Sequence, residues 1–334
     1  MEMKKTILAV AVTGLMAASA QAANVYDADG VSADVYGRMQ FDISDSKDKT
    51  MSGVGSARLG INASSEIAPG IRGIAKGEWQ IRAENSADDA KQLSARHVYA
   101  GFATDDYGQV VFGQTDTAFY QAVAATDIFN TYGYSAFANV EDGRQEGQIV
   151  YNGTFNNFYV GASAQFADDN FKYDLGNPDS GVPAHTTGEY LDKSYAATLG
   201  YTADFGLSVY GGYHAQEFKD GDKNNYALSA SYSRDDLYLG AAYVWAELEK
   251  DGVTGESKVA GYDLVASYAI DKVLVYGGYA FQEAKGNISG DRADEFTLAT
   301  AYSFNSNMKA WAEYKIDQID GNENEWTVAV QYNF

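Results

Sequence analysis

The sequence has no cysteine, three prolines and three histidines among its 334 residues. The missing cysteines exclude disulfide scaffolds, thiolate metal sites and cysteine nucleophiles. Basic residues are also scarce, because 24 lysines and arginines stand against 46 aspartates and glutamates, a formal net charge of −22. A surface that binds nucleic acid needs a basic excess, so this charge argues against a nucleic-acid partner.

Long hydrophobic runs are missing after the N-terminal segment. Lys4 and Lys5 precede an apolar run over residues 7–18, and Ala20-Gln21-Ala22 follows as a small-residue cleavage site. This pattern predicts a secretory signal peptide over residues 1–22 and a mature chain over residues 23–334. An N-terminal anchor is the alternative, but no basic stop-transfer flank follows. The mature chain is then either soluble outside the cytoplasm or crosses a membrane as a closed barrel.

Aromatic residues are abundant, at 14 % of the chain, and they alternate with polar ones. The C-terminus shows this most clearly, because every second residue there is apolar or aromatic: Trp326, Val328, Val330, Tyr332 and Phe334. A period of two fits a strand with one apolar face. Tyrosine and tryptophan near strand ends, Tyr36 and Tyr243 among them, predict aromatic girdles at the membrane interfaces.

The breaks between these alternating runs are themselves alternately short and long. Seven are short: 66–70, 104–108, 155–157, 203–206, 234–236, 270–272 and 305–307. Eight are longer and polar: 44–54, 84–91, 115–146, 168–193, 219–224, 250–258, 285–293 and 320–324. Fifteen connections predict sixteen strands, and short turns at one rim with long loops at the other are typical of an outer-membrane β-barrel. The fold class is therefore all-β, a transmembrane antiparallel barrel formed as one domain over residues 23–334.

Short motifs spread along the whole mature chain resemble the general diffusion porins of Gram-negative outer membranes. They include Val35-Tyr-Gly-Arg38, Ala57-Arg-Leu-Gly60, Ala100-Gly-Phe102, Gly143-Arg144 and the terminal Tyr332-Asn-Phe334. The resemblance implies a homotrimer of sixteen-stranded, water-filled barrels for small hydrophilic solutes and ions. It also implies that the third long loop, 115–146, folds into the lumen as a constriction, and that Tyr332 and Phe334 form a C-terminal signal for the outer-membrane assembly machinery.

The resemblance also assigns charges to the constriction. Its basic wall consists of Arg38, Arg58, Arg96 and Arg144, and its loop acid is Asp127. The family's loop motif is missing, however, since Thr131 stands at the position of its glutamate. The further acidic candidates for the constriction are Glu78, Asp116, Glu141 and Asp142.

The alternation places these arginines in the lumen without reference to any family. With Met39 and Phe41 directed to lipid, Arg38 is directed inward, and Leu59 places Arg58 inward in the same way. With Trp79 directed to lipid, the same alternation directs Glu78 inward. An arginine on the lipid face at the bilayer midplane costs about 2–4 kcal/mol, which favours the inward assignment.

Signals for an enzyme are poor. His97, His185 and His214 lie far apart and form no metal-spaced cluster, and paired aspartates fall in turns, where aspartate is common for local reasons. We expect no enzyme, no metal and no cofactor. The sequence predicts a passive channel of the outer membrane, surrounded by lipid and lipopolysaccharide, with a weak cation preference from its acidic excess. The alternative is an adhesin or receptor-like barrel that binds a partner through its long external loops.

Overall fold

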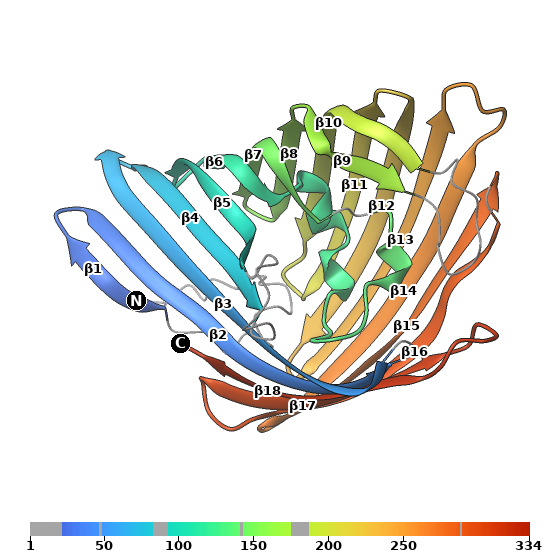
Figure 1. Cartoon of the computed structure of the whole chain (residues 1–334). Helices are drawn as coiled ribbons and strands as arrows, with labels where there is room; N and C mark the ends of the chain where they lie inside the picture. The colour runs from blue at the N-terminus through green and yellow to red at the C-terminus, as the bar shows by residue number, and fades with distance from the viewer. Residues whose placement is uncertain (1–21, 47–48, 83–92, 141–142, 175–186, 288) are drawn as a thin grey trace.

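The computed structural model describes residues 22–46, 49–82, 93–140, 143–174, 187–287 and 289–334 (Figure 1). The predicted signal peptide lies outside these residues except for Ala22. None of the described helices has the length and apolar character needed to cross a bilayer. Strands make up most of the chain, and the helical residues are three short 3₁₀ turns between the sixth and seventh strands.

The strands follow one another as antiparallel hairpins. Their bounds are β1 (Ala23–Ala28), β2 (Val31–Ser46), β3 (Lys49–Ala68), β4 (Ile71–Arg82), β5 (Leu93–Thr104), β6 (Gly108–Asp116), β7 (Arg144–Phe155), β8 (Phe158–Gln165), β9 (Asp168–Asp174), β10 (Thr187–Thr202), β11 (Leu207–Phe218), β12 (Gly221–Arg234), β13 (Leu237–Lys250), β14 (Ser257–Ile270), β15 (Val273–Gly286), β16 (Gly290–Ser303), β17 (Met308–Asp317) and β18 (Glu325–Asn333).

The sheet closes into a barrel because β18 pairs with β2 and β8 pairs with β10. The ring from β2 to β8 and from β10 to β18 contains sixteen strands, as predicted. The two further strands do not widen it. The short β1 pairs with residues 31–35 of β2, beyond the end of β18, and β9 continues the edge of β8 along β10. Closure leaves every wall strand with a hydrogen-bonded neighbour on both sides, as a chain within lipid requires.

The seven predicted short turns all lie between consecutive strands, which confirms them. Two of the predicted long loops are wrong. In place of the predicted loop 44–54, β2 extends to Ser46 and β3 begins at Lys49. In place of the predicted loop 219–224, only Lys219 and Asp220 separate β11 from β12. Polar residues end the apolar alternation before the strand itself ends, because strands that rise above the bilayer no longer need an apolar outer face. The predicted loop 168–193 is also wrong over its described parts, because β9 covers residues 168–174 and β10 begins at Thr187. Residues 175–186 and the whole of the predicted loop 84–91 lie outside the described residues.

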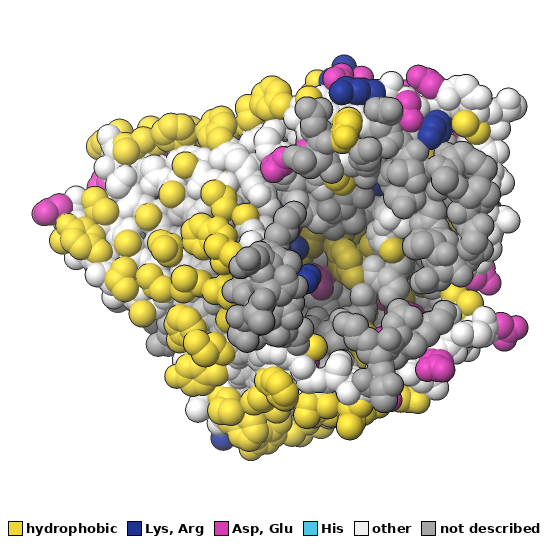
Figure 2. Space-filling model, viewed as in Figure 1, with side chains coloured by type: hydrophobic (Ala, Val, Ile, Leu, Met, Phe, Trp, Pro, Cys, Tyr) yellow, Lys and Arg dark blue, Asp and Glu magenta, His cyan; other side chains and the backbone are white. Residues whose placement is uncertain are grey.

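The two faces of the wall differ in exposure. On β13 Leu239 and Tyr243 are 43 % and 46 % exposed, whereas their respective neighbours Tyr238 and Val244 are buried. We call the face of the exposed residues the outer face and the other the inner face. Figure 2 shows hydrophobic side chains gathered over much of the surface at the left of the view. One girdle assignment is wrong, because the hydroxyl of Tyr36 donates to Glu78 on the inner face.

The connection between β6 and β7 packs against the inner face rather than standing free. Its described part, residues 117–140, contains the 3₁₀ helices η1 (Ala118–Ala122), η2 (Ala124–Thr126) and η3 (Ser135–Phe137). Helix η1 contacts β7, β8 and β10 to β12, η2 contacts β12 to β14, and η3 contacts β14 and β15. We refer to residues 117–140 as the inner segment.

The seam that closes the barrel depends on a close approach at Gly37. Its N–H donates to the carbonyl of Phe334 at 2.8 Å, and the Phe334 N–H donates back to Gly37 at 3.0 Å. A Cβ atom at residue 37 would lie 2.4 Å from the Arg58 carbonyl oxygen and 2.6 Å from the Phe334 ring. A side chain larger than hydrogen therefore forces the seam apart.

We expect Gly37→Ala to destabilise the refolded barrel by about 1–3 kcal/mol, the usual cost of overpacking. Unfolding in urea, followed by tryptophan fluorescence, measures this change. Gly73→Ala is the matched control, since its Cβ would meet only atoms at 3.5 Å or more. Equal midpoints for the two variants would contradict the close approach at the seam.

Candidate functional site

Three of the four predicted wall arginines gather on neighbouring strands. Arg38 of β2 stands directly opposite Arg58 of β3, and Arg58 stands opposite Gln80 of β4. Arg96 lies on β5 at an irregularity in its pairing with β4, and its Nε donates to Glu78 at 2.7 Å. These side chains therefore lie along one stretch of the inner face. The alternation directed Arg38 and Arg58 inward, whereas Arg96 was assigned by the family resemblance alone.

Glu78 belongs to this basic stretch and not to an opposing acidic side. Its carboxylate lies 3.6 Å from Arg58 and 4.0 Å from Lys76, in addition to its bond with Arg96. Its position on β4 between those strands explains the contacts. Glu78 offsets part of the positive charge of the wall that it stands on.

The fourth arginine has its own partner. Arg144 begins β7 and pairs in register with Asp116 at the end of β6, where their side chains approach to 3.6 Å. Asp127 lies in the inner segment, and the hydroxyl of Tyr120 donates to it at 2.9 Å. Asp127 interacts electrostatically with Arg144 and Arg96 but forms no direct ion pair among the described residues. Glu141 and Asp142 lie outside the described residues.

Glu313 of β17 holds the middle of the inner segment. Its carboxylate accepts hydrogen bonds from three consecutive backbone N–H groups, those of Asn130, Thr131 and Tyr132, at 2.7, 3.0 and 2.8 Å. The hydroxyl of Tyr276 on β15 donates to the same carboxylate at 2.7 Å. Hydrogen bonds to a charged acceptor are stronger than neutral ones, so this buried carboxylate fixes the segment to the wall.

Further polar contacts fix the two ends of the inner segment. Near its start, Thr198 of β10 donates to the Ala118 carbonyl at 2.8 Å, and Tyr238 donates to the Ala125 carbonyl at 2.6 Å. Near its end, the Gln282 amide donates to the carbonyls of Ala136 and Ala138, both at 2.9 Å. The wall thus satisfies backbone groups of a segment that has little regular structure of its own.

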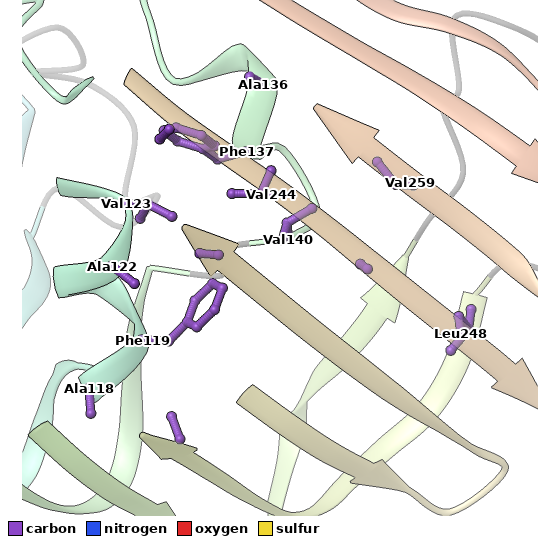
Figure 3. Close-up of a cluster of buried hydrophobic side chains, with 14 of the residues drawn as sticks. Ala118, Phe119, Ala122, Val123, Ala136, Phe137, Val140, Val244, Leu248 and Val259 are labelled. Carbon is purple, nitrogen blue, oxygen red and sulfur yellow. The ribbon is translucent and has the colours of Figure 1, made fainter. Parts of the chain in front are cut away.

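An apolar cluster lies beneath these polar contacts. Phe119, Val123 and Phe137 of the inner segment are completely buried, and Figure 3 shows them grouped around Val244 of β13. The inner face of β10 to β15 is therefore partly apolar, contrary to the simple expectation of a polar lumen. Burial of a large apolar side chain contributes roughly 1.5–3 kcal/mol, so this cluster holds the segment in place together with the hydrogen bonds.

Glycines on the inner face let the segment come close to the wall. A Cβ at Gly212 of β11 would lie 2.6 Å from the Ala122 side chain, and one at Gly240 of β13 would lie 2.4 Å from the Ala125 carbonyl oxygen. Both distances are shorter than a carbon contact allows. The shape of the wall and the course of the inner segment therefore depend on each other.

Glu313 and these glycines were not among the predicted site residues. The alternation over residues 309–317 already directed Glu313 and Trp311 inward, and both side chains are buried. The signal for Glu313 was thus present, but its partners are 181 to 183 positions away in the chain. Local spacing carries no information about such a contact.

We expect Gly212→Ala to displace helix η1 away from β11 and to lower the single-channel conductance. Gly211→Ala is the control on the same strand, because Gly211 pairs with the exposed Leu199 and its Cβ would meet the Leu228 side chain at 3.3 Å. Conductance in planar bilayers measures both variants. The same conductance in Gly212→Ala and Gly211→Ala would contradict the close packing of η1 on the inner face.

Comparison with protein families gives a match to the model described as Gram-negative porin, over residues 8–322. The chain belongs to this porin family. Outer membrane protein U of Vibrio vulnificus is 30 % identical over 334 residues, covering 96 % of this porin and 93 % of the relative. Outer membrane porin PhoE of Escherichia coli is 28 % identical over 341 residues, covering 95 % and 94 %.

Solved structures show the same fold at lower identity. Salmonella typhi OmpF in complex with daunomycin has a TM-score of 0.78 at 18 % identity, covering 93 % of this porin and 100 % of that chain. The trimer form of Vibrio cholerae OmpT has a TM-score of 0.72 at 18 % identity, covering 92 % and 100 %. An anion-selective porin from Comamonas acidovorans also has a TM-score of 0.72, at 17 % identity, covering 91 % and 100 %.

Family and fold together make this porin a diffusion channel of the outer membrane. This family and this fold are those of channels and not of enzymes. One neighbour with this fold is named as anion-selective, so the fold alone does not imply a preference for cations. Selectivity therefore depends on the charges of this chain.

Proposed function

We propose that this porin passes small hydrophilic solutes and ions by diffusion, with a weak preference for cations, and that the inner segment narrows its lumen. The observation that carries the proposal is the pair of surfaces on the inner face. One is the arginine-bearing stretch of β2 to β5, and the other is the inner segment, which is fixed along β8 to β17 and bears Asp127. Solute passes between them.

The magnitude of the charge effects supports a weak preference. An ion about 10 Å from one wall charge interacts with it by roughly 0.4 kcal/mol in bulk water and by ~1.7 kcal/mol at an effective dielectric constant of 20. Such energies bias the flow of ions without stopping it. The acidic excess of −22 raises the concentration of cations near the channel, and the wall arginines oppose it there.

The outer face supports a homotrimer with β2 to β5 at its centre. Eight strongly exposed tyrosines lie on β10 to β18: Tyr195, Tyr201, Tyr213, Tyr243, Tyr268, Tyr302, Tyr314 and Tyr332. The described residues of β2 to β5 have no exposed tyrosine, and their exposed large hydrophobic side chains are aliphatic, methionine or phenylalanine. Tyrosine favours the lipid interface. A face without it suits contact with further copies of the chain.

The remaining expectations concern export and assembly. We propose that residues 1–22 are removed on export, and that Tyr332 and Phe334 are read by the outer-membrane assembly machinery before β18 closes the barrel. Tyr332 is 49 % exposed on the outer face. The apolar outer face then contacts lipid and lipopolysaccharide.

Planar-bilayer recording of the refolded mature protein tests this proposal. We expect stepwise openings that close in three equal levels, and a reversal potential under a salt gradient that reports a modest cation preference. A correctly folded barrel without conductance would overturn the channel function. Single-level closures would overturn the trimer alone, and a reversal potential of the opposite sign would overturn the cation preference alone.

We expect the cation preference to fall as the pH is lowered from 7 to 4, in part through Asp127. Burial raises the pKa of Asp127 above its ordinary value, although the Tyr120 hydroxyl, Arg144 and Arg96 favour its charged form. A raised pKa means that the carboxylate loses its charge at a higher pH than an ordinary aspartate. The reversal potential, measured as a function of pH, reports this loss.

Asp127→Asn removes the charge at every pH. It should lower the cation preference at pH 7 and flatten the pH dependence. Asp271→Asn is the control, because Asp271 lies in the turn between β14 and β15. An unchanged pH profile in Asp127→Asn would exclude this carboxylate from selectivity.

A further inference from the structure

A buried lysine of the wall contacts a side-chain amide of the inner segment. The Nζ atom of Lys309 on β17 donates to the Oδ1 atom of Asn130 at 2.7 Å. Lysine is almost never deeply buried without a partner, and Lys309 is only 7 % exposed. Its amine also lies over the Trp311 ring, 5.2 Å from the ring centroid. An amine is thus held against a carboxamide at the place where the inner segment meets the wall.

Two further groups hold the other end of the same carboxamide. The Asn130 Nδ2 atom donates to the Tyr276 hydroxyl at 2.8 Å and to the Glu313 carboxylate at 3.5 Å. Tyr276 in turn donates to that carboxylate at 2.7 Å. Glu313 and Tyr276 are 2 % and 3 % exposed, and Glu313 interacts electrostatically with Lys309. One buried site therefore contains an amine, a carboxamide, and a carboxylate with its phenol partner.

These groups are the reactants and the proton carriers of an amide exchange. A neutral amine attacks the carbonyl carbon of an amide, and burial disfavours the charged form of an amine. The backbone N–H of Asn130 donates to Glu313 at 2.7 Å, which keeps the carboxamide beside the amine. Reactants held side by side in this way react far faster than free ones. Exclusion of water suppresses the competing hydrolysis of the amide.

We propose that Lys309 and Asn130 form an isopeptide bond that joins β17 covalently to the inner segment. The lone pair of the neutral Nζ forms the Nζ–Cγ bond, and the Cγ–Nδ2 bond breaks with its electrons on Nδ2. Nζ gives up one proton and Nδ2 takes one up and leaves as ammonia, so no net proton and no oxidant are required. The Tyr276 hydroxyl connects Nδ2 to Glu313 and lies on the path of this proton.

The bond fixes the inner segment at the point where Glu313 already binds it. It also closes a covalent loop over residues 130–309, which restricts the unfolded chain and so opposes unfolding. The inference rests on the packing of the inner segment and not on conduction. Its test is therefore independent of the channel function.

Mass spectrometry of a tryptic digest of the protein purified from outer membranes tests the bond. Trypsin does not cleave after an acylated lysine, so the digest should contain residues 97–144 joined to residues 293–315. The mass of this branched peptide should equal the two peptide masses less one ammonia. Fragmentation should place the junction at Asn130 and Lys309.

Two variants remove one reactant each. Lys309→Arg keeps the positive charge but cannot form the bond, and Asn130→Ala removes the acyl group. Both should abolish the branched peptide and give residues 97–144 as a separate peptide. Lys315→Arg is the matched control, because Lys315 lies on the same face of β17 and contacts the Glu325 carboxylate at 3.1 Å. It should retain the branched peptide.

Tyr276→Phe tests the path of the proton. The change keeps the ring and removes the hydroxyl, so the branched peptide should form about a hundredfold more slowly after refolding, the usual effect of losing a proton-transfer group. An equal rate in Tyr276→Phe and the unaltered protein would exclude this hydroxyl from the reaction.

Three results would overturn the isopeptide bond, whatever the conductance of the protein. One is recovery of the two peptides only as separate species from the folded, unaltered protein. Another is loss of ammonia from residues 97–144 alone, which indicates a cyclic imide at Asn130. The third is a branched peptide that persists in Lys309→Arg.

Discussion

Every wall strand of this porin needs a hydrogen-bonded neighbour on both sides, because lipid offers no partner to a free N–H or C=O group. The pairing of β18 with β2 meets this need for the last strand, and Phe334 ends it against Gly37. Closure also fixes which side chains point inward, since the faces alternate along each strand. The charges of the lumen are therefore a consequence of strand register, and a shift by one residue would carry Arg38 and Arg58 into lipid.

The same closure creates an interior that sixteen strands are too wide to fill with their own side chains. The inner segment packs against the inner face of these strands and is supported along its whole course. Apolar residues such as Phe119 and Phe137 bury surface, and Glu313 satisfies three backbone N–H groups. Glycines such as Gly212 allow the close approach. Hydrophobic burial holds the segment on the wall, while the directional bonds to Glu313 determine its position along the wall.

Much of this architecture follows from local sequence patterns. The alternation around Met39 and Leu59 was enough to direct Arg38 and Arg58 inward, because it depends only on neighbouring residues. Loop lengths were less predictable, since Lys223 and Asn224 continue β12 where the polar composition suggested a loop. The contact of Glu313 with residues 130–132 was beyond reach, because only closure brings β17 to the inner segment. Glu78 was assigned to the wrong side of the lumen for a different reason, because the alternation directs it inward without indicating its ion pairs with Arg58 and Arg96 on the neighbouring strands.

The charge of the whole chain and the charge of its wall act over different distances. The chain as a whole has an acidic excess, and the field of an exposed charge is screened within about 8 Å at physiological ionic strength. Arg38 and Arg58 act on a solute at contact, where little solution intervenes. Beside the wall an ion meets guanidinium groups, of which Arg58 lies 3.6 Å from the Glu78 carboxylate. The net charge of the chain therefore does not determine the sign of the field beside the wall, which depends on the few charges that line it.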